Sequence, residues 1–154
     1  MAYFGGTCTA NIEFCSISDS GDHAPAAVWS HLLPVLINIR QSDDSTDVLH
    51  VVSDGPTTQY RNRYNFFLAS VIPGLFGFQR TFWNFSEAVH GKGPADGVGA
   101  AVKRLADRCV LSGEEVGSAR SLCSALKPLT DIRLFLIDNF VSLSDSTFLP
   151  FQTQ

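Results

Sequence analysis

The sequence predicts an α/β domain with a largely parallel sheet. Two observations lead to this prediction: short strand-like segments alternate along the chain with longer segments of helical periodicity, and clusters of turn residues separate them. The 154 residues are enough for one domain with its own core. A hydrophobic content of 45% excludes a disordered chain.

Four segments have the composition of strands. The first alternates polar and apolar residues, and the second is a β-branched run that ends at the turn residues 53–56. The third is apolar and aromatic, and the fourth is a short apolar run near the C-terminus. The predicted strands are Asn11–Ile17, Val48–Val52, Thr81–Phe85 and Asp131–Ile137.

The first predicted helix opens at Asp22 or His23 and has Pro25 in its first turn. Pro34 is expected to kink or end this helix. The residues at helical spacing on its apolar face are Val28, Leu32, Val35, Leu36 and Ile39. The polar run 41–47 is predicted to be a loop.

Three further helices are predicted. Tyr60–Val71 should turn Tyr64, Phe67, Leu68 and Val71 inward, and Glu114–Leu126 forms a later helix. Asp96–Val110 is amphipathic. Its inward residues are Val98, Ala101, Val102, Leu105 and Cys109, and its outward ones are Lys103, Arg104, Asp107 and Arg108. The expected domain spans residues 1–137, and 138–154 form an irregular tail without periodicity.

The chain has no evident membrane or secretion segment. The longest mostly apolar run, Phe66–Phe78, is too short to span a bilayer, and the N-terminus lacks the basic start of a signal peptide. We therefore expect an intracellular protein, nuclear or cytoplasmic. The four cysteines form no CxxC pair, so we expect them to be reduced and mostly packed, without a zinc site.

The net charge of −4 conceals a basic centre. Residues 55–110 carry a net charge of +4, whereas the remainder of the chain carries −8. Clustered Lys and Arg can bind a polyanion even in an acidic protein, although ordinary surface charge is the simpler explanation for any one residue. The basic residues of this stretch are Arg61, Arg63, Arg80, Lys92, Lys103, Arg104 and Arg108.

Two motifs suggest metal-assisted phosphate chemistry. Asp54 leaves the tip of a predicted strand, where open α/β sheets build their sites. After the third strand, residues 90–99 place His90, Lys92, Asp96 and four glycines (91, 93, 97 and 99) at the mouth of a helix. The alternative explanation is two helix N-caps and a tight loop.

The glycine spacing matches neither a dinucleotide fingerprint nor a P-loop. Glycines before a helix nevertheless expose backbone N–H groups to an anion. A small-molecule phosphate enzyme built on Gly91–Gly99 is therefore one alternative function.

Several short motifs together resemble a group of transposon-derived animal proteins, whose domains are similar to ribonuclease-H-like transposase catalytic domains of the three-carboxylate type. The resemblance covers roughly residues 3–137. It rests on Ser-Asp-Gly-Pro-Thr-Thr-Gln-Tyr-Arg-Asn (53–62), Trp-Asn-Phe (83–85), Glu-Ala (87–88), His-Gly-Lys-Gly (90–93), Asp-Gly-Val-Gly (96–99), 103–104 and 106–107, and upstream on 15–19, 23 and 26–32.

The resemblance implies a ribonuclease-H-like mixed sheet flanked by helices and a two-metal mechanism on DNA. Such domains use Mg²⁺, or Mn²⁺, held by carboxylates for cleavage and strand transfer at a phosphodiester. Asp54 would be the carboxylate on the fourth strand, and Asp96 the last one, with Glu87 as its rival. Asp54 and Asp96 would hold the metal, and His90 and Lys92 would contact the phosphate. Arg61, Arg63, Lys103 and Arg104 would add DNA contacts.

The resemblance also implies a first strand with a first carboxylate, and the chain begins after that point. Glu13 and Asp19 are the acids available before the first helix, and Glu13 is a poor substitute by topology. A site without one hard ligand should bind Mg²⁺ weakly. We therefore expect a truncated, inactive remnant, and the question of whether it is an enzyme stays open.

A further alternative is a non-catalytic module that binds nucleic acid or protein. In such a module Trp83, Tyr60 or Tyr64 would form stacking surfaces. The simpler explanation for these aromatic residues is that they pack in the core.

Overall fold

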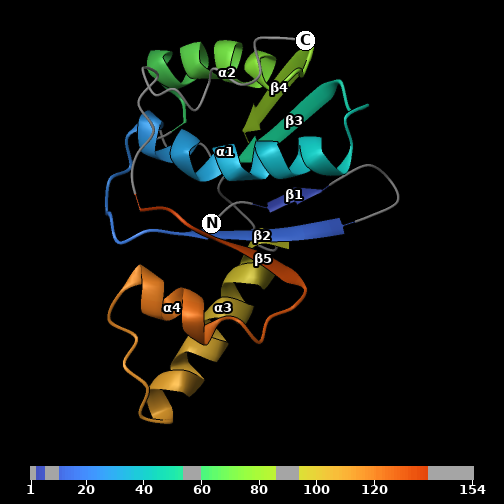
Figure 1. Ribbon diagram of the computed structural model, residues 1–154. Helices are drawn as coiled ribbons and strands as arrows, with labels where there is room; N and C mark the ends of the chain where they lie inside the picture. The colour runs from blue at the N-terminus through green and yellow to red at the C-terminus, as the bar shows by residue number, and fades with distance from the viewer. Residues whose placement is uncertain (1–2, 6–10, 54–59, 86–93, 139–154) are drawn as a thin grey trace. The chain divides into compact units, whose positions relative to one another are not determined.

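The computed structural model describes residues 3–5, 11–53, 60–85 and 94–138, and shows an α/β protein (Figure 1). The chain divides into two compact units. Unit 1 consists of Met1–Gly21 and Gly91–Asp138, and unit 2 of Asp22–His90 and Asn139–Gln154. The predicted tail from Asn139 onward lies outside the described residues.

Unit 1 contains a three-stranded sheet in the order β1-β2-β5. β2 (Asn11–Ile17) pairs antiparallel with β1 (Tyr3–Gly5) and parallel with β5 (Ile132–Leu136). The register places Cys15 opposite Leu134. Asn11–Ile17 and Asp131–Ile137 were correctly predicted as strands, and the structure adds that the two pair with each other.

Two helices pack on the sheet of unit 1. α3 (Pro94–Leu111) and α4 (Ala119–Ala125) contact each other and lie together on one side of the strands (Figure 1). Cys15, Val98 and Ile132 form the buried centre of this packing. The residues around it are Ile17, Ala101, Val102, Leu129 and Leu134. The amphipathic prediction for α3 is confirmed, because Lys103, Arg104, Asp107 and Arg108 are exposed.

The predicted helix Glu114–Leu126 is wrong in its first part. Residues 114–117 are not helical, and α4 begins only after Ser118. The Ser118 hydroxyl accepts the Ser121 N–H while the Ser121 hydroxyl accepts the Ser118 N–H. This reciprocal capping box satisfies two backbone donors at a fixed start point.

Unit 2 contains two parallel strands and two helices. β3 (Val48–Ser53) and β4 (Arg80–Phe85) pair in parallel, and α2 (Arg63–Leu75) connects them. α1 (Pro25–Ser42) packs on α2, and both helices run alongside the strands in Figure 1. Pro25 lies in the first turn of α1 as predicted, but the helix begins at Pro25 rather than at Asp22 or His23. It continues through Pro34 to Ser42, so Pro34 does not end it.

The predicted inward face of α2 is wrong for two of its four residues. Leu68 is buried and Val71 half-buried as predicted, but Tyr64 is 46% exposed and Phe67 is 52% exposed. Asn65 and Ile72 are buried in their place. The segment is apolar on nearly every side, so hydrophobic spacing alone does not define one inward face. A hydrogen bond to the polar residue Asn65 is part of the observed packing, as described below.

Candidate functional site

The carboxyl ends of β3 and β4 lie at the same edge of their sheet. Ser53, the last residue of β3, is opposite Phe85, the last residue of β4. The indole Nε1–H of Trp83 donates to the Ser53 hydroxyl at 3.0 Å and joins the two strands just before they end. The segments that leave both strands therefore start side by side, as the α/β prediction required.

Most of the predicted catalytic residues come soon after these strand ends in the sequence, but they lie outside the described residues. Asp54 comes one residue after β3, and Glu87 comes two residues after β4. His90 and Lys92 also belong to segments that are not described. The expected pairing of Asp54 with Asp96 is therefore not decided.

Asp96 is described, and it lies in the first turn of α3, exposed to solvent. An acidic residue there interacts favourably with the positive end of the helix dipole, so the position is explained without a metal. Gly97 and Gly99 lie inside α3 rather than in a loop. The Gly91–Gly99 loop that was predicted to hold phosphate is thus helical in its second half.

Arg61 lies close to the end of β4, and Arg63 follows it at the start of α2. The Arg61 guanidinium carbon lies 4.9 Å from the centre of the Phe85 ring, and the Phe66 ring packs edge-on to Phe85 at 6.3 Å. Arg63 is the first residue of α2 and is exposed. The described parts of β3, α2 and β4 (residues 48–53 and 60–85) contain three arginines, at 61, 63 and 80, and no Asp or Glu.

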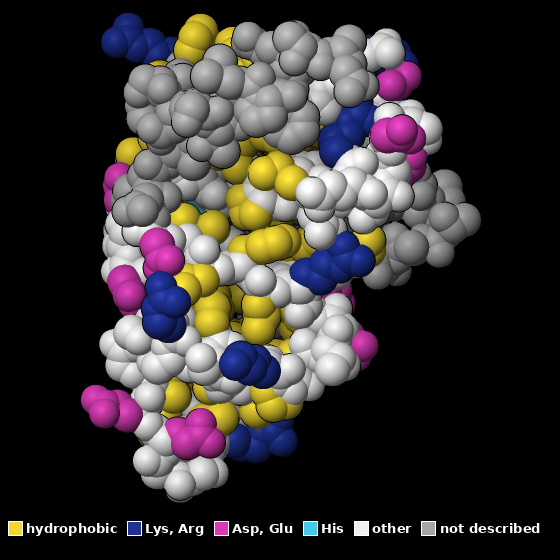
Figure 2. Space-filling view, in the orientation of Figure 1, with side chains coloured by type: hydrophobic (Ala, Val, Ile, Leu, Met, Phe, Trp, Pro, Cys, Tyr) yellow, Lys and Arg dark blue, Asp and Glu magenta, His cyan; other side chains and the backbone are white. Residues whose placement is uncertain are grey.

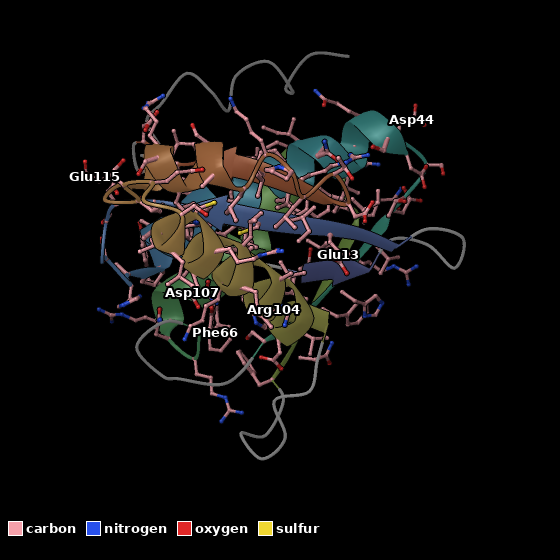
Figure 3. The ribbon with its side chains drawn as sticks, turned by 90° about the horizontal axis from the view of Figure 1, so that it is seen from below. Glu13, Asp44, Phe66, Arg104, Asp107 and Glu115 are labelled. Carbon is pink, nitrogen blue, oxygen red and sulfur yellow. The ribbon has the colours of Figure 1, made fainter. Side chains whose placement is uncertain are left out.

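The other predicted DNA-binding residues belong to unit 1. Lys103 and Arg104 lie on the exposed side of α3, and Figure 3 shows Arg104 and Asp107 projecting from this helix. Over α3 and α4, in the lower part of Figure 2, acidic and basic side chains both occur. The basic residues of the central stretch therefore belong to two units. Segments 48–53 and 60–85, which carry those of unit 2, contain no Asp or Glu, although the exposed Asp47 precedes β3 and its carbonyl accepts the Arg80 N–H.

A buried polar network lies behind the carboxyl edge. The Trp29 Nε1–H donates to Asn65 Oδ1 at 2.8 Å, and Asn65 Nδ2 donates to the Tyr60 carbonyl at 2.9 Å. Asn62 caps α2 by accepting the Asn65 N–H at 2.9 Å. Asn65, which is completely buried, thus ties the segment before α2 to α1. The sequence signal for this network is a single amide, Asn65, within the otherwise apolar or aromatic segment 64–68. Its inward position was not predicted from the sequence.

The aromatic residues predicted as stacking surfaces divide into two groups. Trp83 is half-buried and lies edge-on to Trp29 with 5.8 Å between ring centres, and Tyr60 lies 5.9 Å from Trp83. Both therefore contribute to packing within unit 2. Tyr64 is 46% exposed and is available at the surface.

Asp19 and Glu13, the two acids considered as replacements for a first-strand carboxylate, lie away from the carboxyl edge in the sequence and belong to unit 1. Asp19 Oδ1 accepts the Ala119 N–H at 2.5 Å and so caps the start of α4 from a distant part of the chain. Glu13 lies on β2, opposite Tyr3 on one side and Ile132 on the other.

Within residues 3–5, 11–53, 60–85 and 94–138, no three His, Cys, Asp or Glu side chains come together as a metal centre requires. Cys15, Cys109 and Cys123 are free thiols, and burial raises the pKa of the Cys15 thiol. In the same described part of the chain, none of the helices has the length and apolarity needed to cross a bilayer.

The fold and this edge define an α/β protein with a basic, aromatic strand-end surface in unit 2. The chain belongs to the family described as "Domain of unknown function (DUF8701)", whose model matches residues 1–147. No curated protein and no solved structure matches the chain.

Proposed function

We propose that the chain is a ribonuclease-H-like transposase domain that binds DNA at the carboxyl edge of β3 and β4 and does not cleave it. The observation that carries the proposal is Arg61, which packs on Phe85 at the end of β4, with Arg63 two residues further along at the exposed start of α2. Exposed arginines attract phosphates.

The same edge supports a link with phosphate chemistry. Asp54 and Glu87 follow the two paired strand ends within one and two residues, which favours Glu87 over Asp96 as the partner of Asp54. We assign no step to Mg²⁺, because these two candidate ligands lie outside the described residues and the remaining described acids form no three-ligand group. DNA binding would require a nuclear location or another compartment that contains DNA.

Absence of cleavage is the second half of the proposal. Asp19, one of the acids that could complete a three-carboxylate site, is engaged as a cap of α4. We expect purified protein with Mg²⁺ or Mn²⁺ to leave supercoiled plasmid intact. Nicking that requires the metal and disappears in Asp54→Asn would contradict this expectation.

Fluorescence anisotropy with a labelled DNA duplex tests the binding half. The double variant with Arg61→Gln and Arg63→Gln should weaken DNA binding, because each change removes one phosphate contact. The matched control is Arg120→Gln with Arg133→Gln, which removes the same charge from exposed positions in unit 1. Equal losses in the two double variants would show that only net charge matters and would refute the assigned edge.

A further inference from the structure

The sheet of unit 2 has two different faces. On β3 the residues Leu49 and Val51 are buried, whereas His50 and Val52, which alternate with them, are exposed. On β4 the half-buried residues Trp83 and Phe85 alternate with exposed ones in the same way. Successive side chains in a strand point to opposite faces, so one set forms a single outer face. Its exposed members are His50, Val52, Arg80, Phe82 and Asn84.

Two aromatic rings stack on this outer face. His50 and Phe82 are directly opposite in the parallel register. Their ring centres lie 4.8 Å apart and their planes differ by 11°. Phe82 is 46% exposed and Val52 is 66% exposed. Adjoining exposed apolar side chains on one sheet face are typical of a binding surface, whereas isolated ones are not.

The charge of the outer face selects the class of ligand. Arg80 lies two residues before Phe82 and Asn84 two residues after it, so both share its face. Neither strand contains an Asp or Glu. A planar ring pair flanked by a guanidinium and an amide offers stacking, a positive charge and hydrogen bonds, which are the groups that bind unpaired bases.

We infer that the outer face of β3 and β4 binds single-stranded nucleic acid by stacking an unpaired base on the rings of His50 and Phe82. This inference rests on the proposed DNA binding and names the form of nucleic acid that is recognised. Arg80, on the same face as the ring pair, contacts the backbone, and the ring pair holds a base. A duplex offers no unpaired base to this face, so single strands bind more tightly.

The test compares Phe82→Leu with Phe82→Trp, since both keep an apolar side chain and only the second keeps an aromatic ring. Anisotropy is measured with a labelled oligothymidine of about ten nucleotides and with a duplex of the same length. Phe82→Leu should weaken single-strand binding roughly tenfold, while Phe82→Trp retains it. Duplex binding should be the same in both variants. Val52→Ala, which trims a non-aromatic side chain of the same face, should leave single-strand binding unchanged.

Two results separate the failure of this inference from that of the proposed function. Binding that depends on Arg61 and Arg63 but is unaffected by Phe82→Leu would overturn the stacking inference alone. Absence of binding to either oligonucleotide would overturn both. Concentration-dependent self-association that Phe82→Leu abolishes, with nucleic-acid binding unchanged, would assign the face to a second copy of the chain instead. Thermal unfolding of each variant verifies that it is folded.

Discussion

The indole N–H of Trp29 donates a 2.8 Å hydrogen bond to the side-chain oxygen of Asn65, and both residues are buried. The amide nitrogen of Asn65 is bound in turn to the carbonyl of Tyr60. One buried amide therefore links α1, the start of α2 and the segment that carries Arg61. The arrangement explains why α2 turns Asn65 inward and leaves aromatic residues at the surface.

Asn65→Leu should destabilise the protein by about 2–3 kcal/mol, because it leaves the Trp29 donor and the Tyr60 carbonyl buried without this partner. Urea unfolding measures the change. Trp29→Phe removes the donor, so the double variant should be less destabilised than the sum of the two single changes. Strictly additive effects would mean that the hydrogen bond contributes nothing.

Gly77→Ala should destabilise the protein more than Gly113→Ala. Both glycines have a positive φ, +81° and +88°, so both substitutions carry a similar backbone cost. A Cβ on Gly77 would lie 2.5 Å from the Arg40 guanidinium, whereas one on Gly113 would meet no atom within 4 Å. The difference between the two free energies of unfolding measures this clash, and equal values would contradict it.

Arg40 is unable to move away from such a clash without losing hydrogen bonds. Its guanidinium donates to the carbonyls of Phe76 and Gly77 and, through Nη1, to those of Asp44 and Thr46. Arg40→Lys should therefore cost about 1–3 kcal/mol, since one ammonium group cannot reproduce the planar fork. Arg120→Lys, at an exposed ion pair with Asp138, is the control and should cost less than about 0.5 kcal/mol. Similar costs for the two variants would show that the four carbonyls add no stability.

Stability should fall as the pH rises above about 8.5, the ordinary pKa of a thiol. Burial raises the pKa of Cys15, so between the unfolded and folded pKa values the folded state binds the proton that the unfolded state has lost. The free energy of unfolding then decreases with pH, and the contribution of Cys15 is present at lower pH. Cys15→Ala should make the decrease shallower under reducing conditions. An unchanged slope would show that Cys15 does not contribute.

Asp19→Ala should cost about 0.5–2 kcal/mol, because it removes the acceptor of the Ala119 N–H at the start of α4. Asp22→Ala, which removes the acceptor of the Ala24 N–H, should cost less. Circular dichroism during thermal unfolding gives both values, and a larger loss in Asp22→Ala would contradict the capping role.

Local patterns in the sequence predicted most elements. β3 is a β-branched run that ends at turn residues, and α3 separates Val98 from Lys103 and Arg104 by helical spacing alone. The parallel pairing of β2 with β5 joins residues more than a hundred positions apart, and no local pattern contains that information. The start of α4 differs from the prediction because the capping box of Ser118 and Ser121 defines it, which apolar periodicity does not reveal.

The candidate site was predicted less completely. The rule that strand ends collect functional residues led to the end of β3, and the register of Ser53 with Phe85 places the end of β4 beside it. The stacked pair of His50 and Phe82 was not anticipated, because cross-strand neighbours depend on register. Trp83 was assigned to the surface as one alternative, but its position in the strand alternation places it among the packed aromatics.

The salt dependence of DNA binding tests the central claim most directly. Log affinity should fall linearly with log salt concentration from about 50 mM upward, as counterion release requires. Arg61→Gln with Arg63→Gln should make the slope shallower by about 2, one for each lost phosphate contact, and the unit 1 control should leave it unchanged. No binding by micromolar protein at about 50 mM salt, or the same slope in the Arg61 and Arg63 variant as in the unaltered protein, would contradict the account.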